Sequence, residues 1–342
     1  MWFSQKRRIK YLIDFCIIIN YARLINYMRL LFSFFISRII RKVYFRGMPW
    51  ALSVEPAGFC NLECPECPLG AGVLHRKGGF VSMELFKKIL NESQPELAWL
   101  NLYFQGEPFL NKSLPDLISE AKKYKIYTSI STNGHFLNEE NCRKIINSKL
   151  DELIISLDGI SSETYLKYRK GGDLGKVMNG ITRLIEEKNK LRSPYPLITV
   201  QFIVFIHNEH EIPELINWCK VAKIDRLSLK SAQINDFGDG SIEPSSIEKY
   251  SRYKADNNGK YIMKGHLRNH CFRQWSSAVF SWDGQMTTCC YDKDLQFSPG
   301  NIDDASLRDL WNGGKLQHFR KQIISDKSVF EMCRNCPEGV KN

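Results

Sequence analysis

From residue 51 to about residue 235, short apolar segments alternate with amphipathic ones. Six segments rich in β-branched and aromatic residues predict strands at 51–55, 100–104, 127–132, 152–158, 197–205 and 226–230. Between them, helical periodicity predicts helices at 82–91, 114–124, 138–148, 175–190 and 211–222. This alternation predicts an α/β fold with a parallel sheet, either open or rolled into a partial barrel. Ligands of such folds lie at the carboxyl ends of the strands.

The pattern changes on both sides of this region and predicts four parts. They are a basic amphipathic helical arm (1–48), the barrel (49–235), a linker (236–261) and a small cysteine-rich α+β domain (262–342). Residues 235–246 are rich in Gly, Ser and Asp, which is typical of a linker. In the last part, Asp283–Gly284 separates two alternating runs, which predicts a β-hairpin.

The arm carries most of the protein's charge. It holds ten Lys and Arg against one acid, Asp14, so 10 − 1 = +9 of the net +11 lies there. Its longest charge-free stretch has eight residues, as in 15–22, whereas a membrane-spanning helix needs about 20. Basic residues interleaved with apolar ones predict peripheral contact with an anionic membrane. The alternative is an arm that packs its apolar face on the barrel or on a partner chain. Nucleic-acid binding is not expected, because the arm is too aliphatic.

Length and cysteine usage narrow the class of protein. A chain of 342 residues with 43% hydrophobic residues is long enough for about two folded domains. Its eleven cysteines are odd in number and clustered, which indicates metal binding or catalysis rather than disulfides. The N-terminal apolar run contains Asp14 and lacks a small-residue cleavage site, so no secretory signal is predicted and a cytoplasmic location is expected.

Three cysteines, Cys60, Cys64 and Cys67, lie in the sequence CNLECPEC directly after the first predicted strand. Three thiolates on a short loop can hold three irons of a cubane iron–sulfur cluster and leave the fourth open to another ligand. The alternative is a zinc site completed by His75 or by a distant cysteine.

The order of motifs around this loop resembles the radical S-adenosylmethionine (SAM) enzymes. The motifs are CxxxCxxC after the first strand, QGEP (105–108) after the second, STNG (131–134) and SLDG (156–159) at the ends of the third and fourth, and then YRKGG (168–172). The resemblance covers about residues 50–235 and implies a partial (β/α)6 barrel. Two departures are Gln105, at the first glycine of the family's GGEP motif, and Glu66, where the family usually has an aromatic residue.

The resemblance implies a 4Fe–4S cluster bound by Cys60, Cys64 and Cys67, with SAM on the open iron. Reductive cleavage of SAM would then give a 5′-deoxyadenosyl radical that abstracts a substrate hydrogen. The residues implied in SAM binding are Gln105, Gly106, Glu107, Pro108, Asn133, Ser156 and Arg169. Taken separately, Glu107–Pro108 could be only a turn, Ser156 a capping hydroxyl and Arg169 a solvated helix charge.

A second cysteine set lies in the C-terminal part. It resembles the SPASM or twitch domains of radical SAM enzymes, which implies an auxiliary 4Fe–4S cluster. The ligands implied are Cys271, Cys289, Cys333 and Cys336, with Cys290 as the alternative to Cys289. A zinc ribbon is the alternative for the whole set.

Together these features predict a radical SAM oxidoreductase acting on a small-molecule, sugar or lipid-linked substrate. The auxiliary cluster would accept an electron, Asp292 would accept a proton, and a flavodoxin or ferredoxin would supply electrons. A peptide-modifying radical SAM enzyme is one alternative. A zinc-stabilised α/β binding protein is the alternative from another class.

Overall fold

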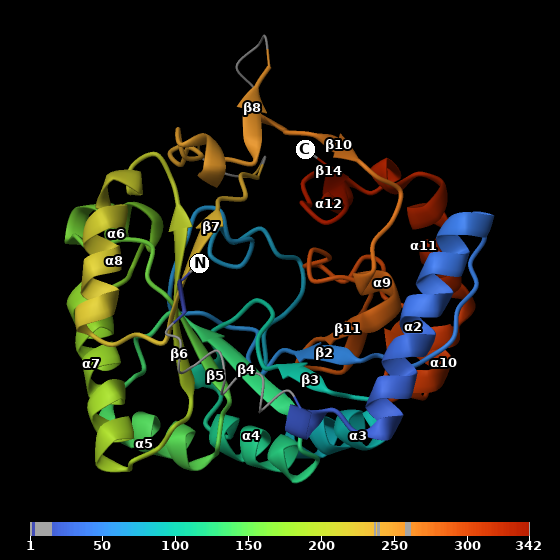
Figure 1. The fold of residues 1–342 in the computed structure, drawn as a ribbon, viewed down its shortest axis with the longest axis horizontal. Helices are drawn as coiled ribbons and strands as arrows, with labels where there is room; N and C mark the ends of the chain where they lie inside the picture. The colour runs from blue at the N-terminus through green and yellow to red at the C-terminus, as the bar shows by residue number, and fades with distance from the viewer. Residues whose placement is uncertain (1, 4–15, 236, 238–239, 257–260, 342) are drawn as a thin grey trace.

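A sheet of ten described strands, most of which run parallel, organises the chain (Figure 1). The structure is a computed structural model that describes residues 2–3, 16–235, 237, 240–256 and 261–341. The parallel strands are β2 (Ala51–Val54), β3 (Trp99–Asn101), β4 (Tyr127–Thr132), β5 (Glu152–Ser156), β6 (Leu197–Val204) and β7 (Arg226–Ser231), adjacent in this order. All lie close to their predicted ranges, so the prediction of an α/β fold with a parallel, barrel-like sheet is confirmed.

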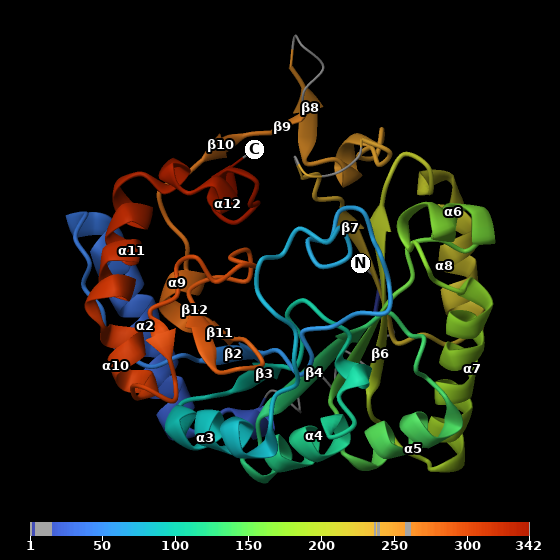
Figure 2. The same cartoon turned by 180° about the vertical axis from the view of Figure 1, so that it is seen from behind.

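Helices cover the outer face of this sheet (Figures 1 and 2). They are α3 (Met83–Ser93), α4 (Leu114–Lys123), α5 (Glu139–Asn147), α6 (Ser162–Tyr168), α7 (Leu174–Lys190) and α8 (Ile212–Val221). Ser82 and Asn138 cap α3 and α5, as side-chain acceptors at helix starts do. The core lies between sheet and helices, where apolar residues such as Leu100, Ile155 and Val200 are fully buried. The alternating positions, which point to the opposite, inner face of the sheet, include half-buried polar residues such as Asn101 and Gln201.

The C-terminal region continues the same sheet. Strand β11 (Ser277–Phe280) pairs in parallel with β2, and β12 (Gln285–Thr287) and β13 (Gly300–Asn301) follow in antiparallel order. The predicted hairpin joins β11 to β12, and Gly284 adopts a φ of +83° that favours glycine. The remaining elements are β8 (Tyr253–Ala255), β9 (Tyr261–Met263), β10 (His266–Leu267), α9 (Arg273–Ser276), α10 (Leu307–Asn312), α11 (Gly314–Ser325), α12 (Glu331–Arg334) and β14 (Val340–Lys341). The range expected to be a linker thus contains β8 and one strand residue of β9, and 236, 238–239 and 257–260 lie outside the described residues.

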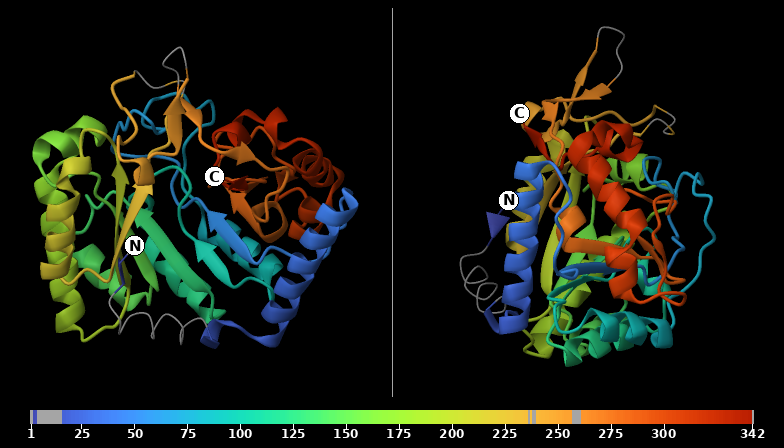
Figure 3. Two further views of the ribbon diagram at one scale, coloured as in Figure 1. Left: turned by 45° about the horizontal axis from the view of Figure 1, so that its top comes forward. Right: turned by 90° about the vertical axis from the view of Figure 1, so that its right-hand side faces the viewer.

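The N-terminal arm takes part in the fold. Strand β1 (Trp2–Phe3) pairs antiparallel with β7 at one edge of the sheet. Helix α2 (Tyr21–Ile40) lies along the other flank, beside α9 and α11 (Figures 1 and 3). Residues 4–15 of the predicted arm, Asp14 included, lie outside the described residues. Within the described ranges, every helix is too short or too polar to cross a membrane.

Candidate active site

The first cysteine loop leaves the carboxyl end of β2 and folds back over the sheet. Cys64 is buried, and Cys60 and Cys67 are half-buried. Burial raises the pKa of the Cys60 thiol, and it raises that of Cys64 to about 11 although the Arg169 cation opposes this. A bound metal centre would favour the thiolate form of these thiols, because metal ligands must be deprotonated.

The QGEP turn packs directly on this loop. The Glu107 N–H donates to the Phe59 carbonyl at 2.7 Å. A Cβ atom on Gly106 would lie 2.1 Å from the Ala57 carbonyl oxygen, so only glycine allows this approach. The position of the turn against the cysteine loop therefore depends on Gly106.

Replacing Gly106 with Ala should push the two loops apart, with a loss of SAM affinity of at least tenfold (about 1.4 kcal/mol). SAM binding to the cluster-loaded protein, measured by calorimetry under anaerobic conditions, tests this. Gly314→Ala is the matched control, because nothing lies within 4 Å of a Cβ there. Unchanged affinity in Gly106→Ala would show that the close approach is not needed.

Glu107 joins the ends of two strands. Its buried carboxylate accepts hydrogen bonds from the Phe109 N–H at 3.1 Å, the Thr132 hydroxyl at 2.7 Å and the Asn133 N–H at 2.8 Å. Burial raises the pKa of Glu107, while these three donors favour its charged form. Glu107 thus fixes the turn after β3 to the STNG segment after β4.

The STNG segment in turn contacts the cysteine loop. The Asn133 amide donates to the Asn61 side chain at 2.8 Å and lies 3.8 Å from the Cys60 sulfur. Asn133 Oδ1 accepts from the His135 N–H at 3.1 Å, and Gly134 follows with a φ of +84°. Ser156 is buried at the end of the next strand, β5. The structure therefore brings Asn133 to the cysteine loop and places Ser156 at the end of β5.

Arg169 is a buried cation beside the cluster loop. Its guanidinium donates twice to the Asp158 carboxylate, and its Nη1 lies 3.9 Å from the Cys64 sulfur. Burial alone would lower the pKa of Arg169, but Asp158 and Cys64 raise it well above its ordinary value. The alternative that Arg169 is a solvated helix charge is wrong, since its side chain is only 13% exposed.

Asp158 is the central residue that the sequence reasoning left without a role. It is fully buried, with a φ of 50°, and it accepts from the Ile203 N–H at 2.6 Å as well as from Arg169. The Asn208 amide donates to its carbonyl at 3.0 Å. The only signal in the sequence was its place in SLDG after a strand, whereas its partners come from β6 and the segment after it.

The second cysteine set gathers around the β11–β12 hairpin. Cys271, Cys333 and Cys336 are buried, and Cys289 and Cys290 are less so. The Tyr291 and Glu338 N–H groups donate to the Cys289 and Cys336 sulfurs, both at 3.4 Å. The charges of Cys271 and Cys336 each act on Cys333, and that of Cys271 also acts on Cys289. Cys271 is thus electrostatically coupled to Cys289, Cys333 and Cys336, and Cys290 is coupled in the same way to Cys336.

We expect Cys289, rather than its neighbour, to bind the auxiliary cluster. Cys289→Ser should lower the iron content from about eight to about four atoms per chain, the content of one cubane. Cys290→Ser is the matched control and should keep about eight. Iron analysis after anaerobic reconstitution checks this, and the reverse result would assign the site to Cys290, whose sulfur lies 3.6 Å from Arg273 Nη1.

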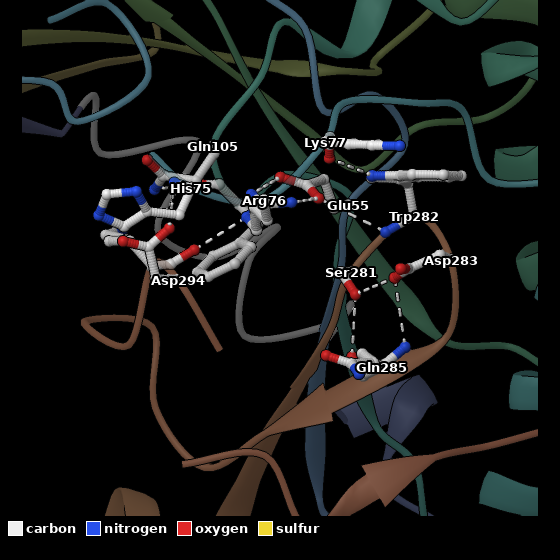
Figure 4. Close-up of polar contacts among 12 residues, drawn as sticks. Glu55, His75, Arg76, Lys77, Gln105, Ser281, Trp282, Asp283, Gln285 and Asp294 are labelled. Carbon is white, nitrogen blue, oxygen red and sulfur yellow. Dashed lines mark hydrogen bonds and ion pairs between the residues drawn. The ribbon is translucent and has the colours of Figure 1, made fainter. Parts of the chain in front are cut away.

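Polar contacts fix the segment after the cysteine loop to this hairpin (Figure 4). Both terminal nitrogens of Arg76 donate to the Glu55 carboxylate, at 2.6 and 2.7 Å. The Trp282 ring N–H donates to the Lys77 carbonyl at 3.1 Å, and the His75 N–H donates to Asp294 at 2.8 Å. The two cysteine regions are therefore held at a fixed separation, which nothing in the local sequence pattern indicates.

His75, the zinc ligand of the alternative interpretation, is exposed. Among the described residues, no three His, Cys, Asp or Glu side chains converge as a single metal ion requires. The thiolates of a cubane each bind a different iron, so they need not meet at one point.

A cavity of about 1080 Å³ reaches from the first cysteine loop to the C-terminal domain. Cys67 and Gln105 border it from the barrel, and Tyr291 and Asp292 border it from the hairpin side. The Gln105 side-chain oxygen is buried and has no hydrogen-bond partner among the described residues. A buried acceptor oxygen without a partner indicates a position where a ligand could donate a hydrogen bond.

Two acids near this cavity hold backbone segments. Asp292 accepts from the Thr287 hydroxyl and from the Gln296 and Phe297 N–H groups, at 2.8 and 3.0 Å. Glu66 accepts from the Asn235 N–H at 2.7 Å, beyond the end of β7. The role of Asp292 as a proton acceptor stays a prediction.

Comparisons with known proteins agree with this geometry. Residues 54–219 match the family model of the radical SAM superfamily, and residues 271–337 match that of SPASM, an iron–sulfur cluster-binding domain. The chain therefore belongs to the radical SAM superfamily and carries a SPASM-type domain. These domains imply 4Fe–4S clusters and SAM as cofactors, and the two thiol sets, with the unpartnered oxygen of Gln105, fit them.

Curated relatives differ in what they act on. The chain is 26% identical to the tungsten-containing aldehyde ferredoxin oxidoreductase cofactor-modifying protein of Pyrococcus furiosus, over 83% of this chain and 86% of that protein. It is also 26% identical to a probable GTP 3′,8-cyclase of Methanococcus maripaludis, over 82% and 95%. A PqqA peptide cyclase of Granulibacter bethesdensis is 28% identical, but the chain spans only 49% of it.

Solved structures show the same fold at low identity. BtrN in complex with AdoMet and 2-DOIA superposes with a TM-score of 0.55 at 17% identity, over 86% of this chain and 95% of that one. SuiB of Streptococcus suis bound to S-adenosylmethionine gives 0.62 at 16% identity, over 86% and 73%.

Proposed function

We propose that this radical SAM enzyme is an oxidoreductase that removes two electrons and two protons from a small-molecule, sugar or lipid-linked substrate. When bound, SAM and its cluster supply the radical that takes the first hydrogen atom, and the auxiliary cluster supplies an acceptor for the second electron. The second proton passes to a nearby base, for which Asp292 is the candidate.

The observation that carries this proposal is the cavity between the two cysteine regions. Gln105 and Cys67 on one side and Tyr291 and Asp292 on the other border the same space. A substrate in it would lie within reach of both cofactor sites. Two hydrogen bonds join the two regions: the Arg76 Nε–H donates to the Lys293 carbonyl at 2.8 Å, and the Trp282 ring N–H donates to the Lys77 carbonyl.

The chain's own residues would bind and orient SAM. The close approach at Gly106 places the backbone of the QGEP turn over the cysteine loop, where it can receive the methionine ammonium, and Glu107 holds that turn in position. Arg169, held by Asp158, presents its remaining guanidinium edge beside Cys64, where a carboxylate could pair with it. Asn133 and Ser156 are the further candidates for SAM contacts.

Relatives support a small-molecule substrate over a peptide. The cofactor-modifying protein and the probable GTP cyclase align over more than four-fifths of both chains. The peptide cyclase aligns over only half of its own length. Peptide modification is the second candidate function, because SuiB was solved with its precursor peptide SuiA and shares this fold.

Substrate screening separates these candidates. Anaerobically reconstituted enzyme is given SAM, a reductant and, in separate reactions, sugars, nucleotides, lipid-linked sugars and peptides. We expect 5′-deoxyadenosine to rise with one of the first three classes, together with a product lighter by two hydrogen atoms. A cross-linked or oxidised peptide as the only product would establish peptide modification instead.

For partners, we propose a cytoplasmic electron donor of the flavodoxin or ferredoxin type and peripheral contact with an anionic membrane. To test the electron donor, each purified donor is mixed with the protein, and reduction of the clusters is monitored as a loss of their visible absorbance.

A further inference from the structure

Helix α2 packs on the protein through a polar side. Arg23, Asn26, Ser33 and Ser37 are buried there, together with Leu30 and Phe34. The Arg23 guanidinium donates to the carbonyls of Ile18, Lys125 and Tyr124, at 2.7 to 2.8 Å. Buried polar groups of this kind are stable only with their partners in place, so these contacts fix the helix about its own axis.

Further contacts along α2 keep the same side inward. The Asn26 side chain exchanges two hydrogen bonds of 2.9 Å with the Met48 backbone. The Ser37 hydroxyl oxygen lies 2.7 Å from both the Ser33 and the Tyr44 carbonyl oxygens and accepts from the Tyr44 N–H at 2.9 Å. The Phe34 ring packs on Trp275 of α9, with ring centroids 5.4 Å apart. The helix therefore cannot turn its other side inward without breaking these contacts.

The outward side of α2 is apolar. Its side chains recur every three or four positions and form one stripe, and each is at least 49% exposed, with Tyr21 at 80% and Ile39 at 76%. The stripe is Tyr21, Leu24, Met28, Phe32, Phe35 and Ile39. Helices of globular proteins bury such a stripe, and an exposed apolar patch of this length marks an interaction site.

The charges around the stripe favour an anionic partner. From Phe15 to Val54 the sequence contains no Asp or Glu. Five exposed cations lie on α2 and the segment after it: Arg29, Arg38, Arg41, Lys42 and Arg46. A second copy of the chain docked through this stripe would bring two such sets together, and their repulsion opposes a symmetric dimer.

The shape of α2 fits a surface rather than a groove. It has 20 residues, so it is about 30 Å long, and it lies along the outside of the molecule (Figures 1 and 3). A bilayer surface can accept the whole stripe at once, with the arginines at the level of the headgroups.

We propose that the outward side of α2, from Tyr21 to Ile39, docks this protein flat on the surface of an anionic membrane. This inference rests on the membrane contact proposed above and assigns that contact to particular residues of α2. It does not depend on the radical chemistry.

The experiment is flotation of the full-length protein, cluster-loaded and under anaerobic conditions, with phosphatidylcholine vesicles that contain or lack phosphatidylserine. We expect the protein to float with the anionic vesicles and to be released as salt rises, because surface charges are screened. The triple variant Leu24→Gln, Met28→Gln, Ile39→Gln should bind at least roughly tenfold more weakly. The matched control, Val221→Gln with Val329→Gln, removes exposed apolar side chains elsewhere and should bind like the wild type.

A second variant tests the charges. Arg29→Gln, Arg38→Gln and Arg41→Gln together should weaken binding to anionic vesicles roughly a hundredfold, since each basic residue contributes about fivefold. All variants alter exposed positions, and their circular dichroism melting curves should match the wild type.

Three outcomes would overturn the proposal. They are no flotation of the wild type at low salt, equal flotation of the triple variant, and a dimer in light scattering that the triple variant abolishes without any vesicle binding. Formation of 5′-deoxyadenosine, measured on the same samples, reports on the proposed reaction separately.

Discussion

Replacing Cys60, Cys64 and Cys67 together with Ala should abolish the cleavage of SAM and halve the iron content. Wild-type protein is expected to hold about eight irons in two cubanes, and the triple variant about four. The reason is that these three thiols are the only cysteines on the loop after β2, whereas the C-terminal set lies in segments that precede β11, follow β12 and include α12.

The control for this variant is the replacement of Cys142 and Cys219, which are buried on the outer helices α5 and α8 and belong to neither set. Ser at these two positions should cost stability and leave the iron content unchanged. Full iron retention in the loop variant would mean that the loop does not bind a cluster.

Asp158→Ala should cause a large loss of stability. It would leave the buried Arg169 cation and the Ile203 N–H without their acceptor. Removing one partner of a buried ion pair lowers the free energy of unfolding by about 3–5 kcal/mol. Urea unfolding of the apoprotein, followed by circular dichroism in the presence of a thiol reductant, measures this change.

Two further variants show whether the effect comes from the buried charge. Asp158→Asn keeps an acceptor for Ile203 but loses the charge, so its stability should fall between the wild type and Asp158→Ala. Asp303→Ala removes an exposed partner of Lys88, where the acid side chain is 64% exposed, and should cost about 0–1 kcal/mol. Equal stability of Asp158→Ala and Asp303→Ala would show that the Arg169 pair is dispensable.

The strands and helices of the barrel could be predicted from local sequence patterns, because each of them buries at least one apolar face. Strands β4 to β7 and helices α3 to α8 other than α6 lie within a few residues of the prediction. Helix α6 (Ser162–Tyr168) is a single short helix without a long periodic stripe, so no pattern indicated it. The pairing of β11 with β2 joins segments more than 200 residues apart, and such pairing leaves no local signal.

The candidate site shows the same division. The order of the motifs predicted that the cysteine loop, the QGEP turn and Arg169 belong to the site, because the resemblance to a family rests on residue types at the ends of strands. It could not indicate that Asp158 holds Arg169 or that Glu55 pairs with Arg76, since both depend on tertiary contacts. The orientation of α2 is a further case. Its apolar stripe alone would predict burial, and the polar contacts of Arg23 and Asn26 determine the opposite orientation.

Formation of 5′-deoxyadenosine by the purified chain tests the central claim most directly. The protein is reconstituted anaerobically with iron and sulfide and is then given SAM with and without a reductant. We predict a brown protein that forms 5′-deoxyadenosine only when the reductant is present, with none formed by the triple Cys60, Cys64 and Cys67 variant. A colourless protein that binds zinc, or a brown one that leaves SAM intact under reducing conditions, would contradict the claim that this chain is an active radical SAM enzyme.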